Sequence, residues 1–181
     1  TTDWQEDASR RDLTINAVYA DEKGNVFDYY NGIDDLEKGI VRFIGNPNLR
    51  IQEDYLRILR FFRFYSIFGK GDIDQKALAA CKANHSGLMK ISIERICDEF
   101  FKILLTANVI KTIKIILDND ILGYILPQAQ HFDCLENLIN LVRKEKLEES
   151  ALRRLFVLYL PDEKLADSFA TRFKFSKKQK E

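Results

Sequence analysis

The chain has 181 residues, of which 46% are hydrophobic and 31% are charged, so it can bury a sizeable core in one large domain or two small ones. Its 28 basic residues balance 28 acidic ones, which excludes a general electrostatic attraction to a polyanion and leaves only a local basic patch for that purpose. No segment reaches the ~20 apolar residues of a membrane span, and the N-terminus lacks a signal-peptide pattern.

The three cysteines predict neither a disulfide framework nor a zinc site. Cys81, Cys97 and Cys134 are odd in number, widely spaced and without a CxxC pair. A reducing cytoplasm is therefore the expected compartment. The sequence also begins without Met and opens on charged residues, which favours a fragment whose upstream part is missing.

The first 47 residues are predicted to form a small β-rich part. The segment "LTINAVYA" (13–20) alternates and is rich in β-formers, and after the turn residues "DEKGN" the segment "VFDYY" (26–30) resumes strand character. Together they predict a β-hairpin. A short helical turn, "IDDLEKG", and a third strand, "IVRFIG" (40–45), are expected to follow.

From residue 48 onward, apolar residues recur every three or four positions, which predicts helices. No Gly/Ser-rich linker separates the two regimes, so the sequence predicts an α+β fold whose helical part packs on the β part. The expected helices are 50–68, 74–84, 92–105, 108–120, 133–146, 149–160 and 162–173.

One helix, "EDYLRILRFFRF" (53–64), carries charges in an unusual pattern. At 100° per residue, Asp54, Arg57, Arg60 and Arg63 would form a slanted polar stripe on a helix that is apolar elsewhere. Such a stripe is expected to face a cleft, a partner or other charges. The alternative is that Glu53 and Asp54 pair with Arg57 and Arg60 on an exposed face, at about 0.2–0.5 kcal/mol for each pair.

The types of these side chains suggest a way to recognise a base. The Asp54 carboxylate only accepts hydrogen bonds and the Arg57 guanidinium only donates them. Cytosine and adenine each offer an amino donor beside a ring-nitrogen acceptor, whereas guanine and uracil place a carbonyl and a ring N–H there. The pair would therefore admit C and A and reject G and U. Arg60 and Arg63 could hold phosphate or position the pair.

Three segments resemble, in order and spacing, successive motifs of the eubacterial-type tRNA nucleotidyltransferase and poly(A) polymerase family, which includes CCA-adding enzymes. They are "RRDLTINA" (10–17), "DYYNGIDDL" (28–36) and "EDYLRILRFFRF" (53–64). "SIERICDEFFKIL" (92–104) resembles a weaker fourth motif, and the resemblance covers residues 4–105.

The resemblance implies the C-terminal part of a nucleotidyltransferase head (1–47), a helical neck carrying the nucleotide-recognition helix (48–110) and a helical body (111–181). Within these parts it implies seven nucleotide-binding residues: Arg10, Arg11, Asp12, Asp54, Arg57, Arg60 and Arg63.

Each of these residues takes an expected role from the motif in which it lies. Arg11 would contact the ribose or triphosphate, and Arg10 and Asp12 would form or brace the same site. Asp54 and Arg57 would read the base, and the two later arginines would complete the pocket. Alternatively, residues 10–12 could be only a cluster of charges at the surface.

Two aspartates and a glycine of the second motif, Asp28, Gly32 and Asp35, would shape the junction between head and neck. The aspartates could equally serve as turn or helix-cap residues, and Asn31-Gly32 could be only a turn. The family's metal-binding carboxylates lie in an upstream motif, and Asp28, Asp34 and Asp35 occupy the wrong context to replace them. We therefore assign neither a catalytic residue nor a metal ligand here, and expect the segment alone to be inactive.

The expected function of the complete protein is template-independent addition of nucleotides to RNA 3′ ends, namely CCA to tRNA from CTP and ATP, with magnesium bound upstream. A poly(A) polymerase or A-adding enzyme is the alternative within the enzyme class, because Asp54 and Arg57 suit both. A non-catalytic RNA-binding module is the alternative if no upstream metal motif exists.

Overall fold

The computed structural model describes residues 3–121, 123, 131–159, 167, 170, 171 and 174. The chain divides into two compact units, Thr1–Gly87 and Leu88–Glu181, which are described separately here. Neither predicted boundary, at 47/48 or at 110/111, coincides with this division. The partition into head, neck and body therefore stays a prediction.

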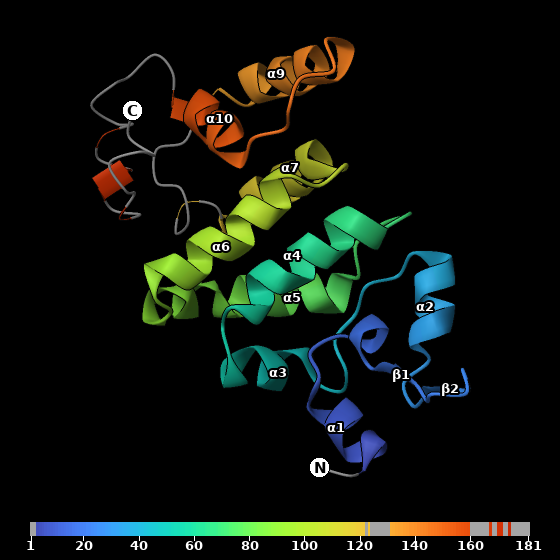
Figure 1. Ribbon diagram of the computed structural model, residues 1–181. Coiled ribbons are helices and arrows are strands. Elements are labelled where there is room, and N and C mark those ends of the chain that lie inside the picture. Colours follow the sequence, from blue (N-terminus) through green and yellow to red (C-terminus); the bar gives the residue numbers. More distant parts are fainter. Residues whose placement is uncertain are drawn as a thin grey trace. The chain divides into compact units, whose positions relative to one another are not determined.

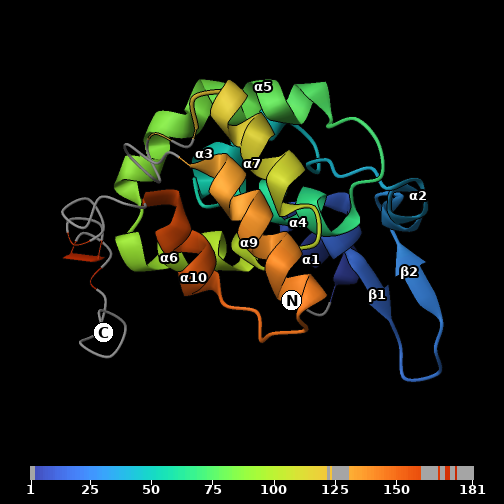
Figure 2. The same cartoon turned by 90° about the horizontal axis from the view of Figure 1, so that it is seen from above.

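The first unit consists of a small hairpin and a set of short helices (Figures 1 and 2). Strands β1 and β2 pair antiparallel, with Val18 opposite Asp28 and Ala20 opposite Val26, which confirms the predicted hairpin and the α+β class. The elements in chain order are α1 (Trp4–Arg10), the 3-10 helix η1 (Thr14–Asn16), β1 (Val18–Ala20), β2 (Val26–Asp28), α2 (Gly32–Lys38), α3 (Pro47–Glu53), α4 (Arg57–Phe68), α5 (Gln75–Asn84) and the 3-10 helix η2 (His85–Lys90).

The β part is smaller than the pattern predicts. Thr14–Asn16 forms a 3-10 turn, so the strand predicted at 13–20 begins only at Val18. The Asn16 amide donates to the Asp12 carboxylate at 2.9 Å, and this local bond competes with an extended backbone. The third strand predicted at 40–45 is wrong: in the described part of the chain, this segment forms an isolated β-bridge between Phe43 and Leu13 and no strand.

The helix α1 was not expected from the sequence. The Asp3 carboxylate accepts the backbone N–H groups of Gln5 and Glu6, at 2.8 and 3.2 Å, and so caps the helix. The signal was present as an Asp directly before "WQED", but the segment is too short to show helical periodicity.

The long helix predicted at 50–68 is broken at Asp54. This residue is extended, with φ −155° and ψ 107°, and it separates α3 from α4. Its carboxylate accepts the Leu56 N–H at 3.1 Å and its carbonyl accepts the Arg57 N–H at 3.0 Å. Aspartate competes with helical hydrogen bonding in this way, so one helix ends here and the next begins. Only Arg57, Arg60 and Arg63 therefore lie on one helix, and the predicted position of Asp54 on the stripe is wrong.

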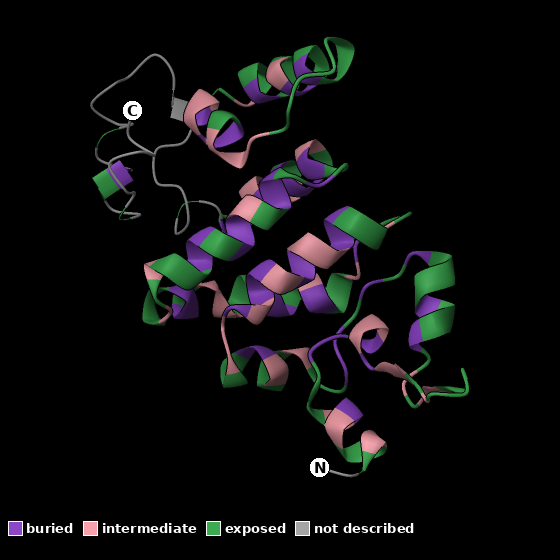
Figure 3. Cartoon of the chain, in the orientation of Figure 1, coloured by how far each residue is buried: buried purple, intermediate pink, exposed green. Residues whose placement is uncertain are grey.

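Helix α4 forms the buried centre of the first unit, as its mainly buried and intermediate colouring indicates (Figure 3). Phe61 and Phe62 are fully buried, and the Phe61 ring stacks on Phe43 with centroids 5.4 Å apart. Burial of large aromatic side chains is the main stabilising contribution to such a core. The arginines of α4 are thereby held on a rigid, well-packed element.

The second unit is helical in its described part. It contains α6 (Ile93–Leu104), α7 (Val109–Asp118), α9 (Phe132–Lys144), α10 (Ala151–Phe156) and the 3-10 helix η3 (Val157–Tyr159), which confirms four of the predicted helices. The Ser150 hydroxyl accepts the Arg153 N–H and caps α10. The helix predicted at 162–173 falls mostly outside the described residues. No described helix is both long and apolar enough to cross a lipid bilayer.

Candidate nucleotide-binding site

Helix α4 contacts the last residue of α1 and the segment that follows α1. The Arg60 Nε donates to the Asp12 carboxylate at 2.5 Å, and the Arg57 Nη2 donates to the Arg10 carbonyl at 3.3 Å. The first and third predicted motifs, far apart in sequence, are therefore adjacent in the first unit. Four of the seven predicted residues are brought together by these contacts.

Asp12 is the buried end of one contact. Only 5% of it is exposed, and its carboxylate also accepts the Leu13 N–H at 3.0 Å and the Asn16 amide at 2.9 Å. Burial raises the pKa of Asp12, but the hydrogen bonds from Arg60 and Asn16 outweigh it and leave the pKa below its ordinary value. Asp12 is thus an ionised brace for Arg60.

Arg57 is mostly buried, with 16% of its side chain exposed. Its Nη1 donates to the Glu53 carboxylate and, at 2.9 Å, to the Arg50 carbonyl, and its Nη2 donates to the Arg10 carbonyl. A guanidinium has five N–H groups, so these contacts leave the Nε–H and one Nη2–H without an acceptor among the described residues. Arg57 is fixed in place yet still able to donate to a ligand.

Asp54 lies on the same turn as Arg57. The Asp54 carbonyl accepts the Arg57 N–H, and the Asp54 carboxylate accepts the Leu56 N–H. A carboxylate has several acceptor positions, so it can accept a further donor in addition to the Leu56 N–H. The turn thus places one acceptor group and one donor group next to each other at the start of α4.

The charges of Arg10 and Arg11 are paired within α1 and its immediate end. Arg10 pairs with Glu6 at the surface, while the Arg11 guanidinium donates to Asp7 at 2.8 and 3.1 Å. The Tyr19 hydroxyl donates to the same Asp7 carboxylate at 2.6 Å, and the hydrogen bonds from Tyr19 and Arg11 lower the pKa of Asp7. Among the described residues, Arg11 contacts Asp7 and Tyr19 rather than α4, so its nucleotide role stays a prediction.

The last residue of the predicted stripe, Arg63, packs on an aromatic ring. Its guanidinium lies 4.7 Å from the Phe64 ring centroid, and that of Arg60 lies 5.8 Å from the same ring. Both distances are within the range of cation–π attraction. The expected role of Arg63 in completing the pocket stays a prediction.

Sequence reasoning did not identify Arg50, which lies at the centre of these contacts. Its guanidinium donates to the carbonyls of Ser9 and Ile44 and, at 3.0 and 3.1 Å, to the Glu53 carboxylate. The available signal was the spacing of Arg50, Glu53 and Arg57, three and four residues apart, which permits a shared carboxylate. The alternative pairing of Glu53 with Arg57 is confirmed, although the Arg57 side chain is mostly buried and not on an exposed face, and Arg60 pairs with Asp12.

The second motif forms a compact turn. The Asp28 carboxylate accepts the N–H groups of Gly32 and Ile33, both at 2.9 Å, and so caps α2. Burial raises the pKa of Asp28, but these backbone hydrogen bonds outweigh it and lower the net value. A Cβ at Gly32 would lie 2.2 Å from the Thr14 carbonyl oxygen, so only glycine permits this approach.

Asp35 fixes α2 to the neighbouring segments. Only 1% of it is exposed, and its carboxylate accepts the Thr14 hydroxyl at 2.6 Å and the Arg42 Nε at 2.7 Å. Asp28 and Asp35 therefore both have structural partners. The capping role considered for Asp28 is observed, while Asp35 lies inside the helix and acts as a buried link.

Two family models match the chain. One, described as "Poly A polymerase head domain", matches residues 1–42, and the other, described as "Probable RNA and SrmB-binding site of polymerase A", matches residues 72–132. The human "CCA tRNA nucleotidyltransferase 1, mitochondrial" is 51% identical over 127 residues, which cover 69% of this chain and 29% of that protein. The chain belongs to the CCA tRNA nucleotidyltransferase and poly(A) polymerase family.

Solved structures of this family show the same fold. A CCA-adding enzyme with ATP is 25% identical with a TM-score of 0.76, covering 97% of this chain and 44% of that one. The CCA-adding enzyme of Bacillus stearothermophilus with CTP is 26% identical with a TM-score of 0.66, covering 93% and 46%. The chain thus spans less than half the length of these relatives.

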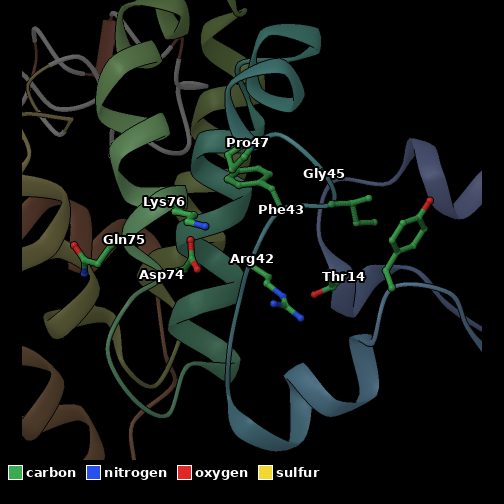
Figure 4. A pocket seen from close by; sticks show the side chains of 10 residues that line it. Thr14, Arg42, Phe43, Gly45, Pro47, Asp74, Gln75 and Lys76 are labelled. Carbon is green, nitrogen blue, oxygen red and sulfur yellow. The ribbon is translucent and has the colours of Figure 1, made fainter.

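A separate pocket of about 580 Å³ lies in the first unit of the chain (Figure 4). Arg42, Asp74 and Lys76 contribute its charged groups, and Thr14 and Tyr30 contribute hydroxyls. None of the seven predicted nucleotide-binding residues lines it. The contacts around α4 and this pocket are therefore different features.

The described residues of this family member do not fit a magnesium site. No three His, Cys, Asp or Glu side chains in this part of the chain gather as metal ligands. The carboxylates of Asp28 and Asp35 are instead bonded to backbone N–H groups, a hydroxyl and a guanidinium. No reaction step is therefore assigned to a metal held by these residues.

Proposed function

We propose that the complete protein containing this chain is a template-independent RNA 3′-end nucleotidyltransferase that adds CCA to tRNA from CTP and ATP. This proposal is supported by the name of the human relative, a CCA tRNA nucleotidyltransferase, and by two solved relatives that are complexes with ATP and with CTP. In the proposed reaction the RNA 3′-hydroxyl oxygen attacks the α-phosphorus of the nucleotide, and pyrophosphate leaves. The binding of magnesium by a motif outside this segment remains a prediction.

The observation that carries the proposal is the arrangement at the start of α4. Arg57 is held by Glu53 and by two backbone carbonyls, yet two of its N–H groups have no acceptor in the described part of the chain. Asp54, on the same turn, supplies a carboxylate. Together they can donate to a ring nitrogen and accept from an amino group, which is the edge that cytosine and adenine share.

Arg60 and Asp12 have a supporting role in this proposal. Their buried contact fixes α4 against the segment that carries Arg10 and Arg11. Those two arginines would contact the ribose or the triphosphate, and Arg63 would complete the pocket. The segment would thus supply nucleotide selection and part of the RNA-binding surface, the latter supported by the model that matches residues 72–132.

The direct test incubates the complete protein with a tRNA that ends before CCA and with each nucleotide triphosphate in turn. We expect C and A to be incorporated and G and U to be excluded. Replacing Asp54 or Arg57 by Ala should relax that choice by about a hundredfold in relative kcat/KM, because the unmatched polar groups that reject the wrong bases are removed. Lys38→Ala, which breaks an exposed ion pair to Asp34, is the control and should leave the choice unchanged.

A poly(A) polymerase is the second candidate, favoured by the family description that matches residues 1–42. It predicts extension by ATP alone into long tails. A non-catalytic RNA-binding module predicts tRNA binding without incorporation of any nucleotide. The cytoplasmic location expected from the cysteines is likewise a proposal, since the human relative is named as mitochondrial.

A further inference from the structure

Arg50 connects three segments of the first unit that surround the start of α4. It lies in α3, with 19% of its side chain exposed. Its guanidinium donates to the Ser9 carbonyl of α1 and, at 3.2 Å, to the Ile44 carbonyl. It also donates to both Glu53 carboxylate oxygens, at 3.0 and 3.1 Å. One planar group thus fixes α1, the segment before α3 and the end of α3 to one another.

Arg50 reaches Arg57 by two independent routes. Its guanidinium holds the Glu53 carboxylate, which accepts Arg57 Nη1, and its own backbone carbonyl accepts the same Nη1 at 2.9 Å. The third anchor of Arg57, the Arg10 carbonyl, lies one residue from Ser9, which Arg50 also holds. Among the described residues, the Arg57 guanidinium thus donates to the Arg50 carbonyl, to the Glu53 carboxylate that Arg50 holds, and to the Arg10 carbonyl next to Ser9.

We propose that Arg50 is a positioning residue that fixes the Arg57 guanidinium for base recognition and so sets nucleotide selectivity. This inference rests on the proposed function, because it assumes that Arg57 reads the base.

The need for such a residue follows from the exposure of Glu53. About half of the Glu53 side chain is exposed, and an ion pair whose carboxylate is in contact with water holds its geometry weakly. A second guanidinium on the same carboxylate restricts it further. Burial raises the pKa of Glu53, but the hydrogen bonds from Arg57 and Arg50 outweigh it and lower the net value, so the carboxylate stays ionised between the two arginines.

A purely structural role for Arg50 predicts a different result. Arg50 would then contribute only stability, and its loss would slow the incorporation of every nucleotide equally. A positioning role predicts that the ratio between correct and incorrect nucleotides changes, since a misplaced Arg57 loses its contact with the correct base while the wrong base loses nothing.

The experiment uses the complete protein and compares Arg50→Gln and Arg50→Lys with the unmodified protein. The ratio of kcat/KM for CTP to that for UTP is measured on a tRNA ending before CCA, together with the Tm of each variant. Arg50→Gln should lower the ratio at least tenfold, because small displacements of a contacting group reduce rates by up to about a hundredfold. Arg50→Lys, which restores the charge beside Glu53, should recover part of the ratio.

Arg154→Gln is the matched control. Arg154 is buried, with 3% exposed, and its guanidinium, like that of Arg50, donates to a backbone carbonyl and a carboxylate, those of Leu104 and Glu149 in the second unit. It should lower the Tm and leave the CTP to UTP ratio unchanged. If Arg50→Gln does not fold, Arg50→Lys is compared with the unmodified protein instead. We then expect Arg50→Lys to lower the CTP to UTP ratio at least threefold, and an unchanged ratio overturns the positioning role.

The possible results separate this inference from the proposed function. An unmodified protein that incorporates U as readily as C contradicts the proposed function and the inference together. An unmodified protein that selects C, combined with Arg50 variants that keep the same ratio at a lower Tm, overturns only the positioning role.

Discussion

The buried contact between Asp12 and Arg60 offers the sharpest test of how the first unit is held together. In Asp12→Asn the amide oxygen can still accept the Leu13 N–H and the Asn16 amide, but an NH2 group, which cannot accept, then faces the Arg60 Nε–H. A charge-assisted hydrogen bond contributes about 1.5–3 kcal/mol, and the 33% exposure of the Arg60 side chain lets water replace part of it. We therefore expect the variant to lose about 2 kcal/mol of unfolding free energy.

Urea unfolding of the 181-residue chain measures this loss. Trp4 is the single tryptophan of the chain, lies in α1 and stacks against Tyr19, so its fluorescence reports on the first unit. With a urea m-value of about 2 kcal/mol/M, a loss of about 2 kcal/mol lowers the midpoint by about 1 M. The double variant with Arg60→Gln should show a coupling energy of about 1–2 kcal/mol. A midpoint shift below about 0.2 M, or no coupling, would refute the assignment of Asp12 as a brace for Arg60.

Two further predictions concern the first unit. Because the pKa of Asp12 is lowered in the folded state, its contribution is present above the unfolded pKa of about 3.9 and is lost as the pH falls through the folded value. The stability difference between the unmodified chain and Asp12→Asn should therefore shrink between about pH 6 and pH 3, and an unchanged difference in urea titrations would contradict this. Gly32→Ala should cost at least about 3 kcal/mol, since its Cβ would meet the Thr14 carbonyl oxygen at 2.2 Å, while Gly71→Ala, with nothing within 4 Å, should cost less than about 0.5 kcal/mol by the same assay.

The periodic parts of the fold could be predicted from the sequence. The hairpin follows from alternation around a turn, and helices such as α5 and α6 follow from apolar spacing. Asp74 caps α5 by accepting the Ala77 N–H at 2.7 Å. These features depend on residues close in sequence, which is why a local pattern suffices for them.

The errors arise where side chains compete with the backbone. Asp12 and Asn16 bond to each other and curl the chain where alternation predicted a strand. Asp54 interrupts a pattern that remains helical in its apolar spacing on both sides. Propensity and periodicity are averages over several residues, so they do not reveal that a single carboxylate accepts a nearby N–H and ends a helix or strand.

The candidate site could be predicted only in part for a related reason. The spacing of charges indicated that Arg57 and Arg60 needed partners, and one nearby acid, Glu53, was considered correctly. The partner of Arg60 is Asp12, which is remote in sequence, and no local spacing reveals it. The resemblance to known motifs grouped these residues as a set, but it did not specify which side chains pair.

The described pairings also explain the surplus of arginines on the α4 stripe. Three arginines exceed the two acids next to them in sequence, yet Asp12 from another segment supplies the carboxylate for Arg60. Glu53 then serves Arg57 together with Arg50. Arg57 has two further N–H groups and lies on the turn that begins with Asp54, which supports the proposal that it contacts a base. The break at Asp54 therefore creates the proposed recognition element, because the turn brings acceptor and donor together.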